Sequence, residues 1–298
     1  MASFTSRIAP LVIRFRGSKW MFSSAARTLR RVERLQRHPA PSAPPKMYPG
    51  VHISHRVTDG WTVYDVVPTA SSPTRAALYL HGGCYVFEID PVHWSLVTKL
   101  AVEASVCITV PIMPLAPTGK ASEVVPRVAD LVQAIAEDFG SNRTSILGDS
   151  SGGGMALAVA QTLADRGVEP LAATVLISPW LDISGTDPRL AEIAPRDPWL
   201  AVPGTHAAGA LYRAELAEAD PLVSPINGSL TGVGPVTMFS GTRDILNADA
   251  ARLVALAAET GHPLDYHEGV GMIHNYPILP MPEGDAARAV IVAAIGEQ

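Results

Sequence analysis

The sequence predicts an α/β protein with a mainly parallel central sheet that is covered by helices on both faces. Apolar segments of strand length alternate with amphipathic segments of helix length over most of the 298 residues, the order that parallel β–α–β units produce. Hydrophobic residues make up 47% of the chain and charged residues 17%, which is ample for burying such a sheet. We therefore expect one large α/β domain with a smaller accessory part.

The expected strands are short and strongly apolar. They comprise residues 61–67, 76–80, 106–110, 144–147, 173–177, 236–240 and 264–267. Amphipathic segments of helix length follow most of them, at residues 92–104, 123–139, 155–165, 248–260 and 285–295. This alternation assigns residues 47–181 and 232–298 to the α/β core.

The alternation breaks between residues 182 and 231. This insert contains Pro195, Pro198 and Pro203, with a helix-forming stretch at residues 206–218, and it is too long for a simple loop. Together with residues 1–46, it is expected to form a cap over the carboxyl edge of the sheet.

Residues 1–46 are strongly basic. Ten Lys and Arg stand against one acid, Glu33, so this segment carries +9 while the remainder of the chain carries −14. Apolar residues recur at near-helical spacing, at Ile8, Phe15, Phe22 and Leu29, with Leu11 and Val32 beside them. Such a stripe indicates a helix that packs on its own protein, and docking on an anionic membrane surface is the alternative. The proline-rich residues 38–45 then form an extended spacer.

A candidate nucleophile lies in the sequence Gly-Asp-Ser-Ser-Gly at residues 148–152. This is the Gly-x-Ser-x-Gly pattern, in which a sharp turn from strand to helix exposes a serine hydroxyl. Gly148 and Gly152 leave room for the turn, and the amides that open the following helix point at the same place. Ser150 is therefore the candidate nucleophile, and a plain glycine-rich turn is the alternative.

A serine hydroxyl needs a base, and the base needs an acid that orients it. When a serine occupies this turn, the acid and then the histidine follow it along the chain. Asp244 and His274 each follow an expected strand, at the edge of the sheet where Ser150 is expected. A helix cap or turn for Asp244 and a purely structural loop position for His274 are the alternatives. Weaker candidates are His262 and His267 as the base and Glu268 as the acid.

Donors for a developing oxyanion are expected from the loop after residues 76–80. That strand runs into His81-Gly82-Gly83-Cys84-Tyr85, where glycines let a substrate approach the backbone closely. The N–H groups of Gly82, Gly83 and Ser151 would form the oxyanion hole, and His81 would fix the loop by hydrogen bonding. The residues expected to contact the substrate are Cys84, Tyr85 and Asp149.

At these positions the chain resembles the hormone-sensitive-lipase-like branch, bacterial family IV, of the α/β-hydrolases. The resemblance extends from about Ala76 to the C-terminus, and its motifs are His81-Gly82-Gly83, Leu115-Ala116-Pro117, Gly148 to Gly153, Ser178-Pro179-Trp180, Asp220 to Pro225, Asp244 and His274. It implies the α/β-hydrolase fold, a helical cap and hydrolysis of short- to medium-chain carboxylic esters through an acyl-serine intermediate. No metal or organic cofactor is implied.

Three features depart from the family pattern. Cys84 stands where a third glycine is usual, and Ser151 replaces an alanine. Met113-Pro114 and Thr118 flank the Leu-Ala-Pro motif, where the family often has Tyr-Arg and Glu. We expect the oxyanion hole to survive with a changed pocket shape.

Two other interpretations of the same residues are possible. An amidase or arylformamidase would use the same serine machinery, and a ligand-binding module would use the fold without chemistry. Cys84 and Cys107 provide neither a disulfide framework nor a metal cluster, and no aromatic-interleaved RNA platform is present. We expect a cytoplasmic protein without a signal peptide that acts on a small-molecule ester, with peripheral lipid contact and homodimer formation as open alternatives.

Overall fold

The computed structural model describes residues 3–296 and contains an eight-stranded sheet in the order β1-β2-β4-β3-β5-β6-β7-β8. The strands are β1 (Val51–Thr58), β2 (Trp61–Pro68), β3 (Ala76–Leu80), β4 (Cys107–Ile112), β5 (Thr144–Asp149), β6 (Ala173–Ile177), β7 (Val236–Gly241) and β8 (Leu264–Gly269). The pairs β1–β2 and β2–β4 are antiparallel, and all other pairs are parallel. The predicted fold class, an α/β protein with a mainly parallel sheet, is confirmed.

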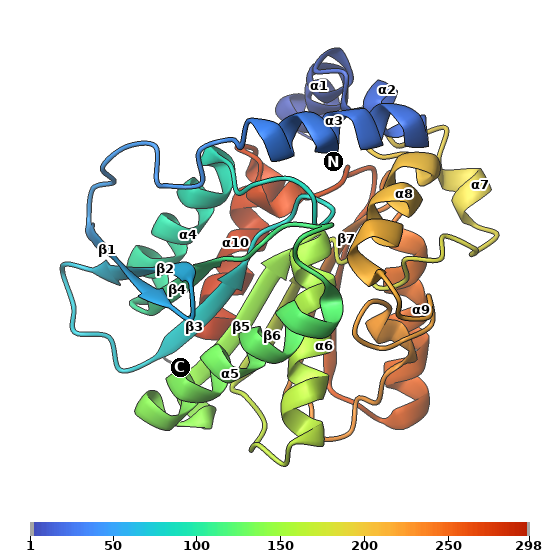
Figure 1. Cartoon of the computed structure of the whole chain (residues 1–298). Helices are drawn as coiled ribbons and strands as arrows, with labels where there is room; N and C mark the ends of the chain where they lie inside the picture. Colours follow the sequence, from blue (N-terminus) through green and yellow to red (C-terminus); the bar gives the residue numbers. More distant parts are fainter. Residues whose placement is uncertain (1–2, 297–298) are drawn as a thin grey trace.

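Helices cover both faces of this sheet (Figure 1). Helices α4 (Pro91–Ala104) and α10 (Pro282–Ile295) bury one face, and α5 (Ala121–Phe139), α6 (Ser151–Asp165) and α9 (Asn247–Thr260) bury the other. Every residue of β3, β5, β6 and β7 is buried, because side chains on both faces of these strands meet helices. This explains why these strands are nearly continuous apolar runs in the sequence.

Strand β1 was not predicted from the sequence. This strand is largely exposed and rich in polar residues, so it lacks the apolar run by which the other strands were identified. It forms a hairpin with β2 through Asp59 and Gly60, whose φ angles are 48° and 84°. Two positive φ angles in a two-residue loop are typical of the Asp-Gly hairpin turn, so this dipeptide was the available signal.

The predicted helices begin later in the sequence than the observed helices. Among the helices of the core the largest error is at α6, which begins at Ser151 and not at residue 155. Its first turn contains Gly152 and Gly154, where a Cβ atom would collide with the carbonyl oxygens of Leu80 and Trp180, respectively. Glycine there reflects close packing of a helix on neighbouring backbone and does not mark a loop.

The described part of this segment, residues 3–46, contains three helices, and the prediction of one helix with a continuous apolar stripe is wrong. The helices are α1 (Phe4–Phe15), α2 (Ser18–Phe22) and α3 (Ala25–Arg37). Gly17, with φ of 79°, breaks the path between the first two. Phe22 is consequently buried while Phe15 is 90% exposed.

The insert contributes α7 (Leu190–Ile193) and α8 (Val202–Arg213). Helix α8 begins four residues before the predicted 206–218, because Pro203 can occupy the first turn of a helix. Helices α2 and α3 pack against α8, with Phe22 and Thr28 in contact with Gly204. These segments lie beyond the carboxyl ends of the parallel strands (Figure 1).

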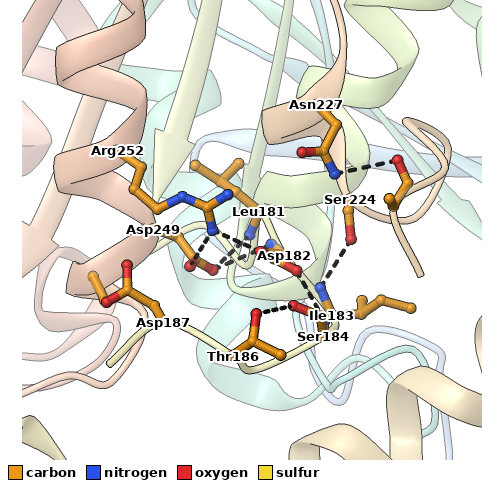
Figure 2. A network of polar contacts seen from close by, with 12 residues as sticks. Leu181, Asp182, Ile183, Ser184, Thr186, Asp187, Ser224, Asn227, Asp249 and Arg252 are labelled. Carbon is orange, nitrogen blue, oxygen red and sulfur yellow. Dashed lines mark hydrogen bonds and ion pairs between the residues drawn. The ribbon is translucent and has the colours of Figure 1, made fainter. Parts of the chain in front are cut away.

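Polar contacts tie the start of the insert to α9 and join the two ends of the insert to each other (Figure 2). The Asp182 N–H donates to Asp249 Oδ2 at 3.2 Å, and Arg252 donates to Asp182 Oδ2 at 2.6 Å. At the other end, Ser224 Oγ accepts from the Ile183 N–H at 3.0 Å. The network therefore anchors the base of the insert on the helix that follows β7.

Candidate active site

Ser150 occupies a strained turn between β5 and α6. Its φ and ψ are 55° and −122°, a conformation that costs about 1–3 kcal/mol for a residue with a side chain. The Ser150 N–H donates to the Ile177 carbonyl at 2.8 Å, and the Ser150 carbonyl accepts from Gly154 and Trp180 at 3.1 and 2.9 Å. A Cβ at Gly148 would collide with the backbone of Gly152, so both glycines of the motif are needed for this turn.

Asp244 and His274 form a buried pair in the loops that follow β7 and β8. Asp244 Oδ2 lies 2.7 Å from His274 Nδ1, and the two side chains are 0% and 3% exposed. Asp244 Oδ1 accepts from the Leu246 N–H at 2.9 Å. Burial lowers the pKa of His274, but the Asp244 carboxylate and the charges of Asp197 and Asp149 raise it above its ordinary value.

Ser150 and His274 line the same cavity, which has a volume of about 740 Å³. Within residues 3–296 no hydrogen bond joins Ser150 Oγ to His274 Nε2, and such contacts often tighten only when a substrate is bound. The Asp244 contact occupies Nδ1 and leaves Nε2 without a hydrogen-bond partner among residues 3–296. The structure thus brings together the three residues that the sequence suggested.

The competing candidates lie elsewhere. His267 pairs with Asp265 at 2.8 Å and stacks on Phe239, while Glu268 accepts from the side chain of Asn247 at 3.2 Å. His262 follows the C-terminus of α9. None of these candidates lines the cavity that contains Ser150, as far as the described residues define it.

The glycine loop after β3 differs from the prediction in one donor. The Gly82 N–H donates to Asp149 Oδ1 at 3.0 Å, so it is engaged within the protein and does not fit the predicted oxyanion role. Gly83 and Cys84 line the cavity, with φ angles of 126° and 53°. Their N–H groups, like that of Ser151, have no hydrogen-bond acceptor among the described residues.

Asp149 lies in the cavity wall, but its carboxylate is committed to protein partners. It accepts from Tyr79 Oη, from the Gly82 N–H and from Asn275 Nδ2, and it lies 3.4 Å from His93 Nε2. Burial raises the pKa of Asp149, but His93 and the donated hydrogen bonds outweigh it and lower the pKa to about 2. These contacts favour a scaffold role over the expected substrate contact.

Tyr85 and Cys84 have different surroundings. Tyr85 stacks on Tyr212 with ring centroids 3.7 Å apart and on Trp180 at 5.5 Å, and it is absent from the described cavity lining. Its side chain therefore does not match the expected substrate contact. Cys84 does line the cavity, and burial raises the pKa of its thiol to about 12, which disfavours the thiolate form at neutral pH.

Asn275 is a site residue that the sequence analysis missed. Its backbone has φ of 54°, which asparagine tolerates better than most residues. Its N–H donates to Ser178 Oγ at 3.0 Å, and its side-chain amide donates to Asp149 Oδ2 at 2.6 Å. Its position directly after His274 was the only available signal.

The rest of the cavity lining comes mainly from residues 13–45 and from apolar residues around the site. These include Ile13, Met21, Phe22, Leu35, Phe87, Trp199, Leu200, Ile278 and Leu279. Within residues 3–296, no cluster of three or more His, Cys, Asp or Glu could hold a metal ion. No described helix is both long and apolar enough to span a bilayer.

Comparisons with known proteins point to one family. A family model described as alpha/beta hydrolase fold matches residues 77–278. A triacylglycerol lipase of Mycobacterium tuberculosis is 31% identical over 232 residues, which cover 77% of this chain and 48% of the lipase. An acetyl-hydrolase of Streptomyces hygroscopicus is 30% identical and covers 82% of each chain. The chain thus spans about half the length of the lipase and most of the acetyl-hydrolase.

A solved structure extends the likeness over nearly the whole chain. It is the crystal structure of an esterase from the bacterial hormone-sensitive lipase family, with 26% sequence identity and a TM-score of 0.82. The similarity covers 99% of this chain and 100% of that one.

Proposed function

The chain belongs to the α/β-hydrolase fold family, in its hormone-sensitive-lipase-like branch, and we propose from that premise that it hydrolyses short- to medium-chain carboxylic esters. The observation that carries the proposal is the buried Asp244–His274 pair, whose histidine lines the same cavity as Ser150. Relatives named acetyl-hydrolase and triacylglycerol lipase support a carboxylic ester as the substrate class.

In the proposed reaction, Ser150 Oγ attacks the ester carbonyl while His274 Nε2 accepts the hydroxyl proton. The Asp244 carboxylate holds the imidazole with its Nδ1–H directed at Oδ2 and stabilises the imidazolium that forms. His274 then returns the proton to the leaving alcohol. Water, deprotonated by the same imidazole, attacks the acyl-serine and releases the carboxylic acid.

The negative oxygen of the tetrahedral intermediate would be bound by the N–H groups of Gly83, Cys84 and Ser151. These amides have no acceptor within the described residues, and Gly83 and Cys84 line the cavity. Loss of one such donor typically raises the barrier by about 3–4 kcal/mol. Gly82 instead orients the loop by donating to Asp149.

We also propose that residues 1–46 and 182–231 act as the cap that selects the acyl chain. The first segment contributes Met21, Phe22 and Leu35 to the cavity, and the second contributes Trp199 and Leu200. These apolar side chains suit an alkyl group, and the finite volume of about 740 Å³ suits short to medium acyl chains.

The test is hydrolysis of a p-nitrophenyl ester series, from acetate upward, by the wild type and by Ser150→Ala. Removing the nucleophile should lower kcat by about 10⁴-fold or more, as in other serine hydrolases, while the melting temperature stays close to that of the wild type. The chain length with the highest kcat/KM would give the size of the acyl pocket. Comparable turnover by the two proteins would contradict the proposal.

A finer proposal concerns the outer side of α1 and α2, which we infer makes peripheral contact with an anionic lipid surface. Phe15 is 90% exposed and Trp20 65% exposed, and the surrounding segment carries a net charge of +9. Exposed aromatic side chains among cationic ones favour the interface of anionic bilayers. Sedimentation of the wild type with anionic vesicles should exceed that of Phe15→Ser/Trp20→Ser, and equal binding would dismiss the idea.

Cytoplasmic location and homodimer formation stay predictions.

A further inference from the structure

Asp197 is a buried carboxylate of the insert that the sequence did not single out. It is 2% exposed, and its Oδ2 accepts from the Ile245 N–H at 2.9 Å. Its Oδ1 accepts from the Trp199 N–H at 2.7 Å and from the Leu200 N–H at 2.9 Å. All three hydrogen bonds come from neutral backbone groups. A buried carboxylate with only such partners is costly to keep ionised, and groups of this kind concentrate at functional sites.

On the core side, Asp197 binds the same backbone turn as Asp244, the residue proposed to orient the catalytic histidine. The N–H of Ile245 donates to Asp197, and the next N–H, that of Leu246, donates to Asp244 Oδ1 at 2.9 Å. The other oxygen of Asp244 lies 2.7 Å from His274 Nδ1. Any displacement of this turn therefore moves the carboxylate that orients the imidazole.

On the cap side, Asp197 holds a loop that contacts the same imidazole. The ring of Trp199 meets His274 edge-on, with centroids 5.5 Å apart and planes at 86°. Trp199 and Leu200 also line the cavity that contains Ser150. The N-terminal helices reinforce this loop, because Lys19 Nζ donates to the Leu200 carbonyl at 2.7 Å.

We propose that Asp197 is a positioning residue for the catalytic base: it joins the loop that carries Trp199 to the turn that carries Asp244, and so fixes His274 between them. The inference rests on the proposed esterase reaction. It assigns the insert a part in orienting the triad in addition to its part in forming the acyl pocket.

The charges around Asp197 make this role measurable. Burial and the Asp244 charge raise the pKa of Asp197 to about 6, and Asp197 in turn helps to raise the pKa of His274. The cation facing this loop from the cap is Lys19, whose pKa burial lowers while Asp197 raises it. A second cation near this loop is Arg243, which precedes Asp244 in the sequence. Its guanidinium donates to the Arg196 carbonyl at 3.3 Å.

The test is the pH dependence of kcat/KM for p-nitrophenyl butyrate in Asp197→Asn and the wild type, with Ser150→Ala as the activity blank. Asparagine offers one acceptor oxygen where aspartate offers two, so one of the two connections is lost. We expect kcat/KM to fall about tenfold or more, mainly through kcat. The acid limb of the profile should move to lower pH by about half a unit, because one negative charge near His274 is gone.

Asp187→Asn is the matched control. Asp187 also lies in the insert, and its Oδ1 also accepts the N–H of the residue two positions on, at 2.9 Å, but it pairs with Arg189 and does not line the described cavity. It should leave both kcat/KM and the acid limb unchanged. Wild-type kinetics in Asp197→Asn would overturn the inference, and so would lower activity with an unmoved acid limb. Failure of the wild type to exceed Ser150→Ala would instead contradict the esterase proposal.

Trp199→Leu gives a second test that leaves the buried carboxylate intact, should Asp197→Asn not fold. It removes the ring that contacts His274 while keeping an apolar residue in the cavity wall. We expect kcat to fall about threefold or more, with a smaller change in KM and a melting temperature near that of the wild type. Unchanged kcat in this variant would contradict positioning of His274 through the loop.

Discussion

The side-chain amide of Asn275 donates to the carboxylate of Asp149 at 2.6 Å and thereby joins the loop that follows β8 to the end of β5. One end of this link is adjacent to His274 and the other to Ser150, so two residues beside the proposed base and nucleophile set their relative position. Asp149 also accepts from the Gly82 N–H, so the same carboxylate orients the glycine loop. A single buried acid therefore connects three strand-end loops.

Asn275→Ala should weaken both activity and stability. The change removes a donor from a buried carboxylate, and leaving such a group with fewer partners costs about 1–3 kcal/mol. We expect kcat to fall about tenfold, because small errors in the placement of a base are costly, with the unfolding free energy lower by that cost. Steady-state kinetics and urea unfolding would measure the two effects.

Asn247→Ala is the control for Asn275. Asn247 also donates from its side chain, to Ser240, Tyr266 and Glu268 at 3.1 to 3.3 Å, but it does not line the described cavity. Its replacement should leave kcat within about twofold of the wild type. Equal losses of kcat in the two variants would argue against a specific link between the loops.

The activity should decline in acid around a midpoint above 6.5, the ordinary pKa of histidine. His274 must be neutral to accept the serine proton, and its pKa is raised by the Asp244, Asp197 and Asp149 charges in spite of burial. The stabilisation from charged His274 is complete below the unfolded pKa and is lost as pH rises through the higher folded pKa. A kcat/KM profile from pH 5 to 9 measures the midpoint of this decline. A midpoint below 6.5 would contradict the raised pKa of His274.

The sequence predicted the parts of the fold that depend on local pattern. Strands such as β3 and β6 are continuous apolar runs, and Ser150, Asp244 and His274 each follow a recognisable strand or motif. The hairpin strand β1 was missed because this exposed segment carries a weak apolar pattern. The break at Gly17 was missed because the apolar residues on either side of it keep one near-helical spacing. Asp197 could not be found, since its role depends on an approach to Ile245, 48 positions away.

The roles of the glycine-loop residues also could not be predicted from the sequence, although these residues are neighbours in the chain. The sequence His-Gly-Gly indicates a loop open to substrate, but which amides are free depends on where the Asp149 carboxylate lies. Because that carboxylate accepts from Gly82, the free donors are shifted one position along, to Gly83 and Cys84. No local pattern encodes this shift.

Asp249 should make the protein less stable at high pH. Burial and the Asp182 charge raise its pKa to about 8, although Arg252 opposes this. With the folded pKa above the unfolded value of 3.8, the stability associated with the protonated form is complete below the unfolded pKa. It is lost progressively as pH rises toward about 8.

Asp249→Asn should flatten that dependence. The amide is neutral throughout, and its oxygen can still accept from the N–H groups of Leu181 and Asp182. We expect the variant to be more stable than the wild type by about 1 kcal/mol or more at pH 9, with a smaller difference at pH 5. Urea unfolding at the two pH values measures this, and parallel pH profiles for the two proteins would contradict the raised pKa.

Cys84→Gly should retain esterase activity and accept bulkier esters. The proposed donor at this position is the backbone N–H, which glycine keeps, and the positive φ of 53° is one that glycine adopts without strain. Loss of the thiol enlarges the cavity next to Ser150, so we expect kcat/KM for p-nitrophenyl acetate to stay within about threefold while longer or branched acyl chains gain relative to it.

Iodoacetamide provides an independent check on the same residue. Because burial raises the pKa of the Cys84 thiol to about 12, the wild type should keep its activity during treatment at pH 7.5, where very little thiolate is present. Rapid inactivation of the wild type, together with resistance of Cys84→Gly, would show an accessible thiolate. Loss of activity in Cys84→Gly without any reagent would mean that the sulfur itself, and not the backbone amide, is what the reaction requires here.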